Sequence, residues 1–301
     1  MNKKTINNLL KLMTKSSLIA LLGSFFPVLY ILFPAMFVAE SLKEGIVKVM
    51  GCFIGVCLIL AILISPVVGI SVLTMFGPMI LIFNYMIINK YDVNTTIVIN
   101  AILFFVSMIF ISYTFGITPE TLKSQDTISK FIEMQKELLD ASVNVDFSTS
   151  NITMIYNRTL QIMPAILLLM SLFISYTTYT ITGRTLLKEN KIIMQPSSFI
   201  FFRLPNGIVI SSIIGVAGVF LFQELIGENY FVIIENIVIV MGTLLLFEGL
   251  SVAKFLMMKA RMASILQILI IVCALIIPGV QIIFIVLGFF DVLLNFRNVP
   301  N

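Results

Sequence analysis

The sequence contains no histidine and no tryptophan, and charged residues make up only 11% of its 301 positions. Without histidine, the chain lacks the most common metal ligand and the usual general base near neutral pH. Hydrophobic residues account for 59% of the chain, and the mean hydropathy is +1.09. So little polar surface cannot coat a soluble globule, and the composition therefore indicates an integral membrane protein.

Several motifs that carry chemistry are also missing. The chain has no G-x-x-x-x-G-K-[ST] loop, no H-E-x-x-H, no G-x-S-x-G and no pair of intramembrane aspartates. Cys52, Cys57 and Cys273 lie in apolar segments without C-x-x-C spacing, which favours small buried hydrophobes over a disulfide or metal site. We therefore expect no enzyme activity, no metal, no cofactor and no nucleic-acid partner.

Apolar runs recur along the whole chain. A helix needs about 20 apolar residues to cross a bilayer, and suitable runs cover 47–65, 66–88, 95–117, 155–181, 207–226, 230–257 and 263–296, besides the opening stretch to residue 38. The first and last stretches are each too long for one upright helix and contain Pro27 and Pro278. We expect an all-α fold, a polytopic helical membrane protein with eight to ten membrane segments.

Lysine and arginine mark the cytoplasmic side of membrane proteins. Fifteen of the 19 basic residues fall in clusters that can share that side: Lys3, Lys4, Lys11, Lys15, Lys43, Lys48, Lys90, Arg184, Lys188, Lys191, Arg203, Lys254, Lys259, Arg261 and Arg297. The clusters share one side only if the opening stretch turns back near Pro27 and the closing stretch turns back at Pro278–Gly279. Both termini are then cytoplasmic, and the segments left outside are acidic.

We expect three parts in the chain. Residues 1–183 form an N-terminal membrane block, 184–206 a cytoplasmic interfacial elbow, and 207–301 a C-terminal membrane block. In the first block, the outer loop 118–152 begins with a helix-entry signal, Thr118 followed by Pro119. Its apolar residues share one face, which predicts an amphipathic helix that either rests on lipid or covers a pocket. In the elbow, Pro205 forbids a continuous helix into the next span.

Charged and amide side chains within the spans are candidate site residues, because such groups are costly in lipid. Arg158, Gln161 and Glu235 lie near the outer ends of their spans and are our hypothetical substrate-binding residues. The competing interpretation is that the two charged groups snorkel to the headgroups.

Three deeper polar residues have structural interpretations beside the functional one. Glu248 is either a site carboxylate or a helix-end contact with Lys254, Lys259 or Arg203. Asn84 and Asn100 are typical of interhelical hydrogen bonding, with ligand binding as the alternative.

Three short stretches carry a resemblance: Phe202–Pro205 (FRLP), Glu248–Ser251 (EGLS), and Gly288–Asp291 (GFFD) followed by Asn295–Arg297. In these the chain resembles the YybS-like family of bacterial membrane proteins. The resemblance covers nearly the whole chain and implies a multi-pass protein of the bacterial plasma membrane. That family is functionally uncharacterised, so the resemblance implies no catalytic residues.

The first block is also similar in layout to the S components of energy-coupling-factor vitamin transporters, with six short membrane segments and a capping outer loop. Those proteins dock on a transmembrane partner through small residues spaced four apart on the first helix. Here Ala20 and Ser24 have that spacing, with the bulky Leu21 and Leu22 between them.

Two functions are compatible with these observations. In the first, the N-terminal block binds or transports a small molecule beneath the outer loop. In the second, the protein is a non-transporting scaffold that docks a partner through the elbow and the C-terminal helix, where Arg203, Asp291 and Arg297 form a cytoplasmic-face cluster and Asp291 pairs with Arg203. The expected partners are the lipid bilayer and another membrane protein or an ATPase subunit.

Overall fold

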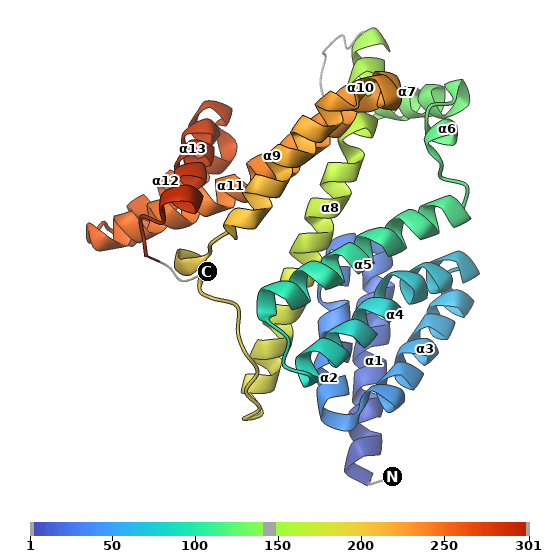
Figure 1. Ribbon diagram of the computed structural model, residues 1–301. Coiled ribbons are helices and arrows are strands. Elements are labelled where there is room, and N and C mark those ends of the chain that lie inside the picture. Colours follow the sequence, from blue (N-terminus) through green and yellow to red (C-terminus); the bar gives the residue numbers. More distant parts are fainter. Residues whose placement is uncertain (1–2, 141–148, 299–301) are drawn as a thin grey trace. The chain divides into compact units, whose positions relative to one another are not determined.

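The computed structural model describes residues 3–140 and 149–298, and every regular element within these ranges is a helix (Figure 1). The helices group into two compact units. Unit 1 comprises residues 1–153 and 167–196, and unit 2 comprises residues 154–166 and 197–301. The long helix α8 therefore contributes residues to both units. The division of the chain into 1–183, 184–206 and 207–301, made from the sequence, stays a prediction.

Unit 1 is built from helices of the first part of the chain. They are α1 (Lys3–Phe25), η1 (Pro27–Ile31), α2 (Phe33–Glu44), α3 (Ile46–Leu63), α4 (Pro66–Ile88), α5 (Val93–Thr114), α6 (Pro119–Leu122), α7 (Gln125–Asp140) and the later part of α8 (Thr149–Leu187). Helix α3 packs against α1, α2 and α4, and α4 packs against α5 (Figure 1). Local signals set the helix starts: Ser65 caps α4 ahead of Pro66, and Asp92 accepts the backbone N–H of Thr95 at 3.0 Å.

The centre of unit 1 is aromatic. Phe33 contacts Phe37, Phe53 and Phe76, with ring centroids 5.0 to 5.9 Å apart, and Phe76 lies 5.3 Å from Phe104. Four of these rings are at most 1% exposed, and Phe76 is 3% exposed. Edge-to-face and tilted arrangements suit the ring quadrupoles, so the cluster holds its helices by packing rather than by charge.

Unit 2 contains the remaining helices. They are η2 (Phe199–Phe201), α9 (Asn206–Leu221), α10 (Gln223–Ile226), η3 (Gly227–Asn229), α11 (Tyr230–Lys259), α12 (Ser264–Ile276) and α13 (Pro278–Leu294). Helices α12 and α13 meet at Ile277 with a bend of 105°. Pro278 explains the break, because it has no N–H to continue the helix and occupies the first position of the next one.

The helical fold expected from the sequence is confirmed. Among the described residues, five helices are long and apolar enough to cross a membrane: α3, α4, α5, α8 and α11. The bent pair α12–α13 makes a sixth if it is one span. The expected breaks are also confirmed, since α1 ends at Phe25 just before Pro27 and α12 ends just before Pro278. The total of eight to ten segments and the cytoplasmic termini stay predictions.

The loop that the sequence predicts on the outer side begins with the expected cap. Thr118 caps α6 at Pro119 through a capping box, in which the Thr118 and Thr121 side chains each accept the other residue's backbone N–H. The helix does not continue from there, because α6 ends at Leu122 and α7 begins at Gln125. Residues 141–148 of the predicted loop lie outside the described residues.

Candidate functional site

Two helix backbones of unit 2 approach each other closely at glycine. A Cβ atom added to Gly249 of α11 would lie 1.8 Å from the carbonyl oxygen of Phe284 of α13. A Cβ atom on Gly288 of α13 would lie 2.1 Å from the carbonyl oxygen of Leu245. Only residues without a side chain allow this contact, and small residues are the usual device for close helix pairs in membranes. Glu248 and Asp291 lie next to this crossing, Glu248 beside Gly249 on α11 and Asp291 one turn after Gly288 on α13.

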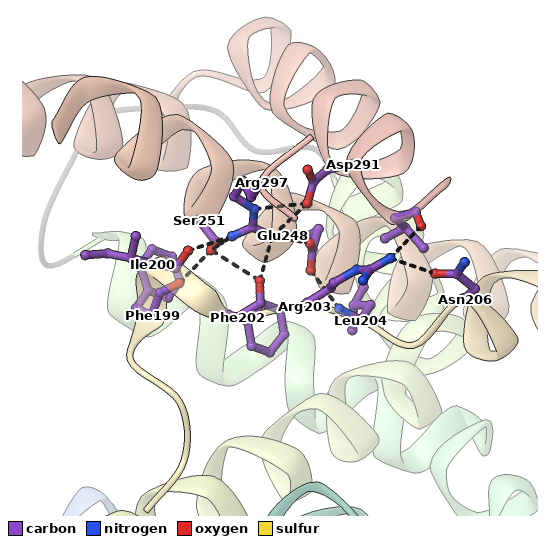
Figure 2. A network of polar contacts seen from close by, with 11 residues as sticks. Phe199, Ile200, Phe202, Arg203, Leu204, Asn206, Glu248, Ser251, Asp291 and Arg297 are labelled. Atoms are coloured by element: carbon purple, nitrogen blue, oxygen red, sulfur yellow. Dashed lines mark hydrogen bonds and ion pairs between the residues drawn. The ribbon is translucent and has the colours of Figure 1, made fainter. Parts of the chain in front are cut away.

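Arg297 joins these two carboxylates (Figure 2). Its Nη2 donates to Glu248 Oε1 at 2.5 Å and to Asp291 Oδ2 at 2.8 Å, and its Nε also donates to Asp291 Oδ2 at 3.0 Å. Glu248 and Asp291 are fully buried, and Arg297 is 8% exposed. A buried charge is tolerated only when it is paired and hydrogen-bonded, and here one guanidinium pairs with both carboxylates.

The guanidinium also binds the elbow. Arg297 Nη1 donates to the carbonyl of Ile200 at 2.7 Å and to Ser251 Oγ at 2.5 Å, while Nη2 donates to the carbonyl of Phe202 at 2.8 Å. Ile200 lies in the single 3₁₀ turn η2 and Phe202 directly follows it. Backbone carbonyls that are not satisfied by a longer helix must find a partner within the protein when they lie in a membrane. We call the set formed by Ile200, Phe202, Glu248, Ser251, Asp291 and Arg297 the Arg297 lock.

Local backbone geometry brings Arg297 back to the cluster. Helix α13 ends at Leu294, its C-cap residue Asn295 has a left-handed conformation with φ of 49°, and Asn298 has φ of 51°. Asparagine tolerates this region better than most residues. The chain therefore reverses after α13, and Arg297 folds back onto Asp291 on the last turn of the helix.

Arg203 lies beside the lock (Figure 2). Its Nη2 donates to Asn206 Oδ1 at 3.4 Å and to the carbonyl of Val292 at 3.5 Å. The next residue, Leu204, donates its backbone N–H to Glu248 Oε2 at 2.8 Å. The elbow is thus attached to α11 and α13 at several points.

The lock contains Asp291 and Arg297 of the predicted cytoplasmic-face cluster, while Arg203 lies beside it, and the ion pairs differ from the expected ones. Asp291 makes its ion pair with Arg297, whereas the sequence suggested Arg203. Glu248 also makes its ion pair with Arg297, whereas the helix-end interpretation named Lys254, Lys259 or Arg203. Arg297 comes last among the described basic residues, and nothing in its spacing signals that the chain turns back there.

The predicted outer-side residues also meet within unit 2. Arg158 forms an ion pair with Glu235 through both terminal nitrogens, and the guanidinium side chain is 54% exposed. Next to it, Asn236 Nδ2 donates to the carbonyl of Gln161 at 2.8 Å, and Asn236 Oδ1 accepts the N–H of Ala165 at 2.8 Å. In a regular helix these two backbone groups pair with each other.

Asn236 therefore inserts its amide into the hydrogen-bond ladder of α8 beside Pro164. Proline inside a helix removes one N–H and displaces the preceding turn. A side-chain amide has the same donor and acceptor as a peptide group, so Asn236 bridges the opened turn. The Gln161 side chain has no part in this contact; its backbone carbonyl does.

In unit 1, four buried and uncharged polar residues follow one face of α8, and we call them the neutral polar seam. Helix α8 buries Ser171, Ser175, Thr178 and Thr182, all 0% exposed. Ser175 Oγ donates to the carbonyl of Ile97 at 2.7 Å, and Thr182 Oγ1 donates to the carbonyl of Ala35 at 3.4 Å. Their spacing of three and four residues places them on one face of the helix. The sequence analysis considered charged and amide side chains within the spans and therefore did not select these hydroxyl residues.

The two predicted asparagines also lie in the interior of unit 1. Asn84 Nδ2 donates to Ser41 Oγ at 2.9 Å, joining α4 to α2. Asn100 Nδ2 donates to the carbonyl of Thr96 at 2.9 Å, and its Oδ1 is buried without a hydrogen-bond partner. Thr178 Oγ1 is also buried without such a partner. Buried polar atoms of this kind call for a water or a ligand group.

The small residues of α1 face inward. Ala20 is 0% exposed and its carbonyl accepts the Tyr30 hydroxyl at 3.1 Å. Ser24 lies 3.1 Å from the same hydroxyl. These two residues hold η1 against α1, so they form no small-residue surface of the kind that the transporter resemblance implies.

Two charged residues end α2, which is not among the candidate spans. Lys43 Nζ lies 2.7 Å from Glu189 Oε1 and 3.2 Å from Glu40 Oε2. Desolvation lowers the pKa of Lys43, but the hydrogen bond to Glu189 and the charge of Glu40 outweigh it and raise the pKa above its usual value. The hydrogen bond from Asn8 lowers the pKa of Glu44.

Comparisons with known proteins identify a family. A family model described as "Predicted membrane protein (DUF2232)" matches residues 16–292, and the chain therefore belongs to this family. No curated protein and no solved structure matches the chain. Both the α11–α13 crossing and the neutral polar seam lie within the matched residues, while Arg297 lies just beyond them.

Proposed function

We propose that this member of the DUF2232 family is a membrane-embedded docking protein, whose unit 2 offers a rigid face built on the locked elbow. The observation that carries the proposal is the Arg297 lock. Every nitrogen of the guanidinium is used within the protein, and the lock fixes the short 3₁₀ turn η2 and the residue after it. A recognition surface of low conformational entropy is what a specific partner requires.

The chemistry of the face favours another membrane protein as the partner. Phe201 lies inside the locked segment with half of its surface exposed, and it follows Ile200 in an apolar run. An exposed aromatic residue on an ordered backbone is typical of an interface anchor. This role requires no catalytic residue and no cofactor, in line with the expectation that the protein is not an enzyme.

Site-specific photo-crosslinking in intact cells tests the docking proposal. A photoreactive amino acid at Phe201 is expected to give one discrete adduct, whose size and identity distinguish an integral membrane partner from an ATPase subunit. The matched control is Phe220 of α9, which is 58% exposed and lies on a regular helix. Adducts at Phe201 that are absent, or that match those at Phe220, reject the proposal.

A second candidate function is the binding or transport of a small molecule by unit 1. The observation that favours it is that buried polar atoms of unit 1, among them Asn100 Oδ1 and Thr178 Oγ1, have no hydrogen-bond partner within the described residues. The order of the elements, with α6 and α7 placed between α5 and α8, agrees with the layout expected from the S-component resemblance. The YybS-like resemblance adds no substrate to this proposal.

Thermal-shift screening of the purified protein against small metabolites tests this candidate. A bound solute is expected to raise the unfolding temperature, and Asn100→Leu or Thr178→Val is expected to remove that increase. Stabilisation that persists in both unit 1 variants shows that the solute binds elsewhere.

The proposed orientation places both termini in the cytoplasm of a bacterial cell, with eight to ten membrane segments in the plasma membrane. It rests on the distribution of basic residues. Cysteine introduced at Lys43 or Lys48 is then inaccessible to a membrane-impermeant maleimide in whole cells. Labelling from outside rejects the orientation.

A further inference from the structure

The acceptors of the Arg297 lock are oriented by groups other than Arg297. The Ser251 hydroxyl donates its proton to the carbonyl of Phe199 at 2.6 Å, so that a lone pair of Oγ is directed at the guanidinium. Glu248 Oε2 accepts the N–H of Leu204 at 2.8 Å, which leaves Oε1 for Arg297. The acceptor positions are therefore set in advance, as in a preorganised binding site.

The arrangement of these acceptors matches a planar fork. Two carbonyls, a hydroxyl and two carboxylates receive hydrogen bonds from Nε, Nη1 and Nη2 at 2.5 to 3.0 Å (Figure 2). The acceptors come from three parts of unit 2: the elbow, α11 and α13. A guanidinium presents its N–H groups in a fixed plane, whereas an ammonium is a compact point charge that cannot reach all of them at once.

We infer that Ile200, Phe202, Glu248, Ser251 and Asp291 form a guanidinium-binding site that Arg297 fills in cis and that accepts a free guanidinium ion when the Arg297 side chain is removed. The inference deepens the proposed function and rests on the same lock, but it involves no partner. A guanidinium group is thus what holds the elbow against α11 and α13.

The charges around the site require a cation there. Glu248 and Asp291 are fully buried, and Asp291 Oδ1 is buried without a hydrogen-bond partner. Two further cations lie near the site: Arg203, which donates to Asn206 and to the carbonyl of Val292, and Lys254, whose Nζ lies 5.8 Å from the Phe199 ring centroid. Arg297 itself occupies the position between the two carboxylates.

Chemical rescue of Arg297→Ala tests the inference. Unfolding of the purified full-length protein is followed with a fluorogenic maleimide, which reacts with Cys57 and the half-buried Cys52 and Cys273 as they become exposed. The variant is expected to unfold at least about 5 °C below the wild type. Guanidinium chloride at constant ionic strength is expected to restore at least half of this difference, with half-saturation on the order of millimolar.

Sodium and ammonium chloride at the same concentrations are expected to restore none of the difference, and the wild type is expected not to respond. Equal recovery with sodium or ammonium, or no saturable recovery with guanidinium, overturns the inference. Ser251→Ala in the Arg297→Ala background is expected to weaken the rescue several-fold. The matched control is Ser212→Ala, because the Ser212 hydroxyl donates only to the nearby carbonyl of Val209 in its own helix.

Arg297→Lys tests the same site if the Arg297→Ala protein does not accumulate in the cell. The lysine retains the charge but not the planar donors, so its level in membranes and its unfolding temperature are expected to lie closer to those of Arg297→Met than to the wild type. A lysine variant equal to the wild type overturns the inference. Failure of the Phe201 crosslink affects the docking proposal alone, because the rescue assay contains no partner.

Discussion

Unit 1 and unit 2 hold their helices together by different means. Unit 1 uses an aromatic cluster and neutral hydrogen bonds from serine, threonine and asparagine to neighbouring helices. Unit 2 uses a glycine contact between two backbones and a buried cluster of opposite charges. Helices in lipid gain little from the hydrophobic effect on association, so each unit depends on packing and on polar contacts.

The difference follows from the backbone that each unit has to satisfy. The long helices of unit 1 satisfy their own backbone groups, and a few weak side-chain contacts are enough to align them. Unit 2 includes the short 3₁₀ turn η2, where the carbonyls of Ile200 and Phe202 accept hydrogen bonds from Arg297. A guanidinium supplies several donors at one point, and the two carboxylates compensate its charge.

The largest expected effect comes from the glycine contact. Gly249→Ala places a Cβ atom 1.8 Å from the backbone carbonyl oxygen of Phe284, so α11 and α13 have to separate. We expect the destabilisation to exceed the roughly 1–3 kcal/mol of ordinary overpacking, because a backbone cannot rotate away as a side chain does. Detergent-extracted protein is expected to lose its monodisperse peak in gel filtration.

The matched control is Gly242→Ala on the same helix, where an added Cβ atom has nothing within 4 Å. This variant is expected to behave like the wild type, since alanine also favours the helical state. Similar losses in both variants contradict a specific backbone contact at Gly249.

The second prediction compares the charged lock of unit 2 with a neutral contact of unit 1, the hydrogen bond between Asn84 and Ser41. Glu248→Ala leaves the guanidinium with one carboxylate and the Leu204 N–H without its acceptor, and we expect a cost of about 3–5 kcal/mol. Asn84→Ala removes one neutral contact with Ser41, and we expect a cost of about 0.6 kcal/mol. Melting curves of the two purified variants measure the difference, and equal shifts would show that charge has no special part in unit 2.

The sequence predicts the fold better than the site. Helical spans, the proline breaks and the Thr118 cap follow from local signals, namely apolar length, a missing N–H and a hydroxyl acceptor, and the structure contains all three. Contacts between distant segments have no such signal. Glu248 and Asp291 were identified as candidates because charges in apolar runs are rare, but their ion pairs with Arg297 depend on the chain reversal at Asn295.

The neutral contacts were harder still to predict. Ser251 lies in an apolar run, where a single hydroxyl is common and carries no signal of its own. Its hydrogen bonds to the carbonyls of Phe199 and Phe202 depend on the fold, which brings these residues beside α11. Ser171, Ser175, Thr178 and Thr182 share a helix face, but spacing alone does not tell a packed face from a lipid-exposed one. Asn236 bridges α8 because Pro164 opens a turn on a helix far away in sequence.

The third prediction asks whether a neutral contact in unit 2 behaves like those of unit 1. Asn236→Leu removes both hydrogen bonds to α8, and Gln161 and Ala165 are then free to pair with each other as in a regular helix. We expect a loss of about 1 kcal/mol, the usual size for one interhelical polar contact in a membrane protein. Asn157→Leu, at an exposed position of α8, is the control in the same melting assay. A cost as large as that of Glu248→Ala would mean that the Pro164 turn depends on Asn236.

The smallest loss of stability is expected when the ion pairs of Lys43 are removed. These pairs measure what a charged contact contributes when one partner is exposed to solvent. The carboxylate of Glu189 is 53% exposed, so Lys43→Met is expected to cost less than about 1 kcal/mol. The raised pKa of Lys43 fixes the sign of the pH dependence: the contribution is complete below the usual value of 10.5 and is lost as the pH rises through the folded-state pKa. Melting temperatures of the wild type and Lys43→Met should therefore differ by a constant small amount from pH 6 to 9 and converge only in strong alkali. A difference that disappears at neutral pH, or one as large as that of the lock, would show that burial is not what separates the strong charged contacts of unit 2 from the weak ones of unit 1.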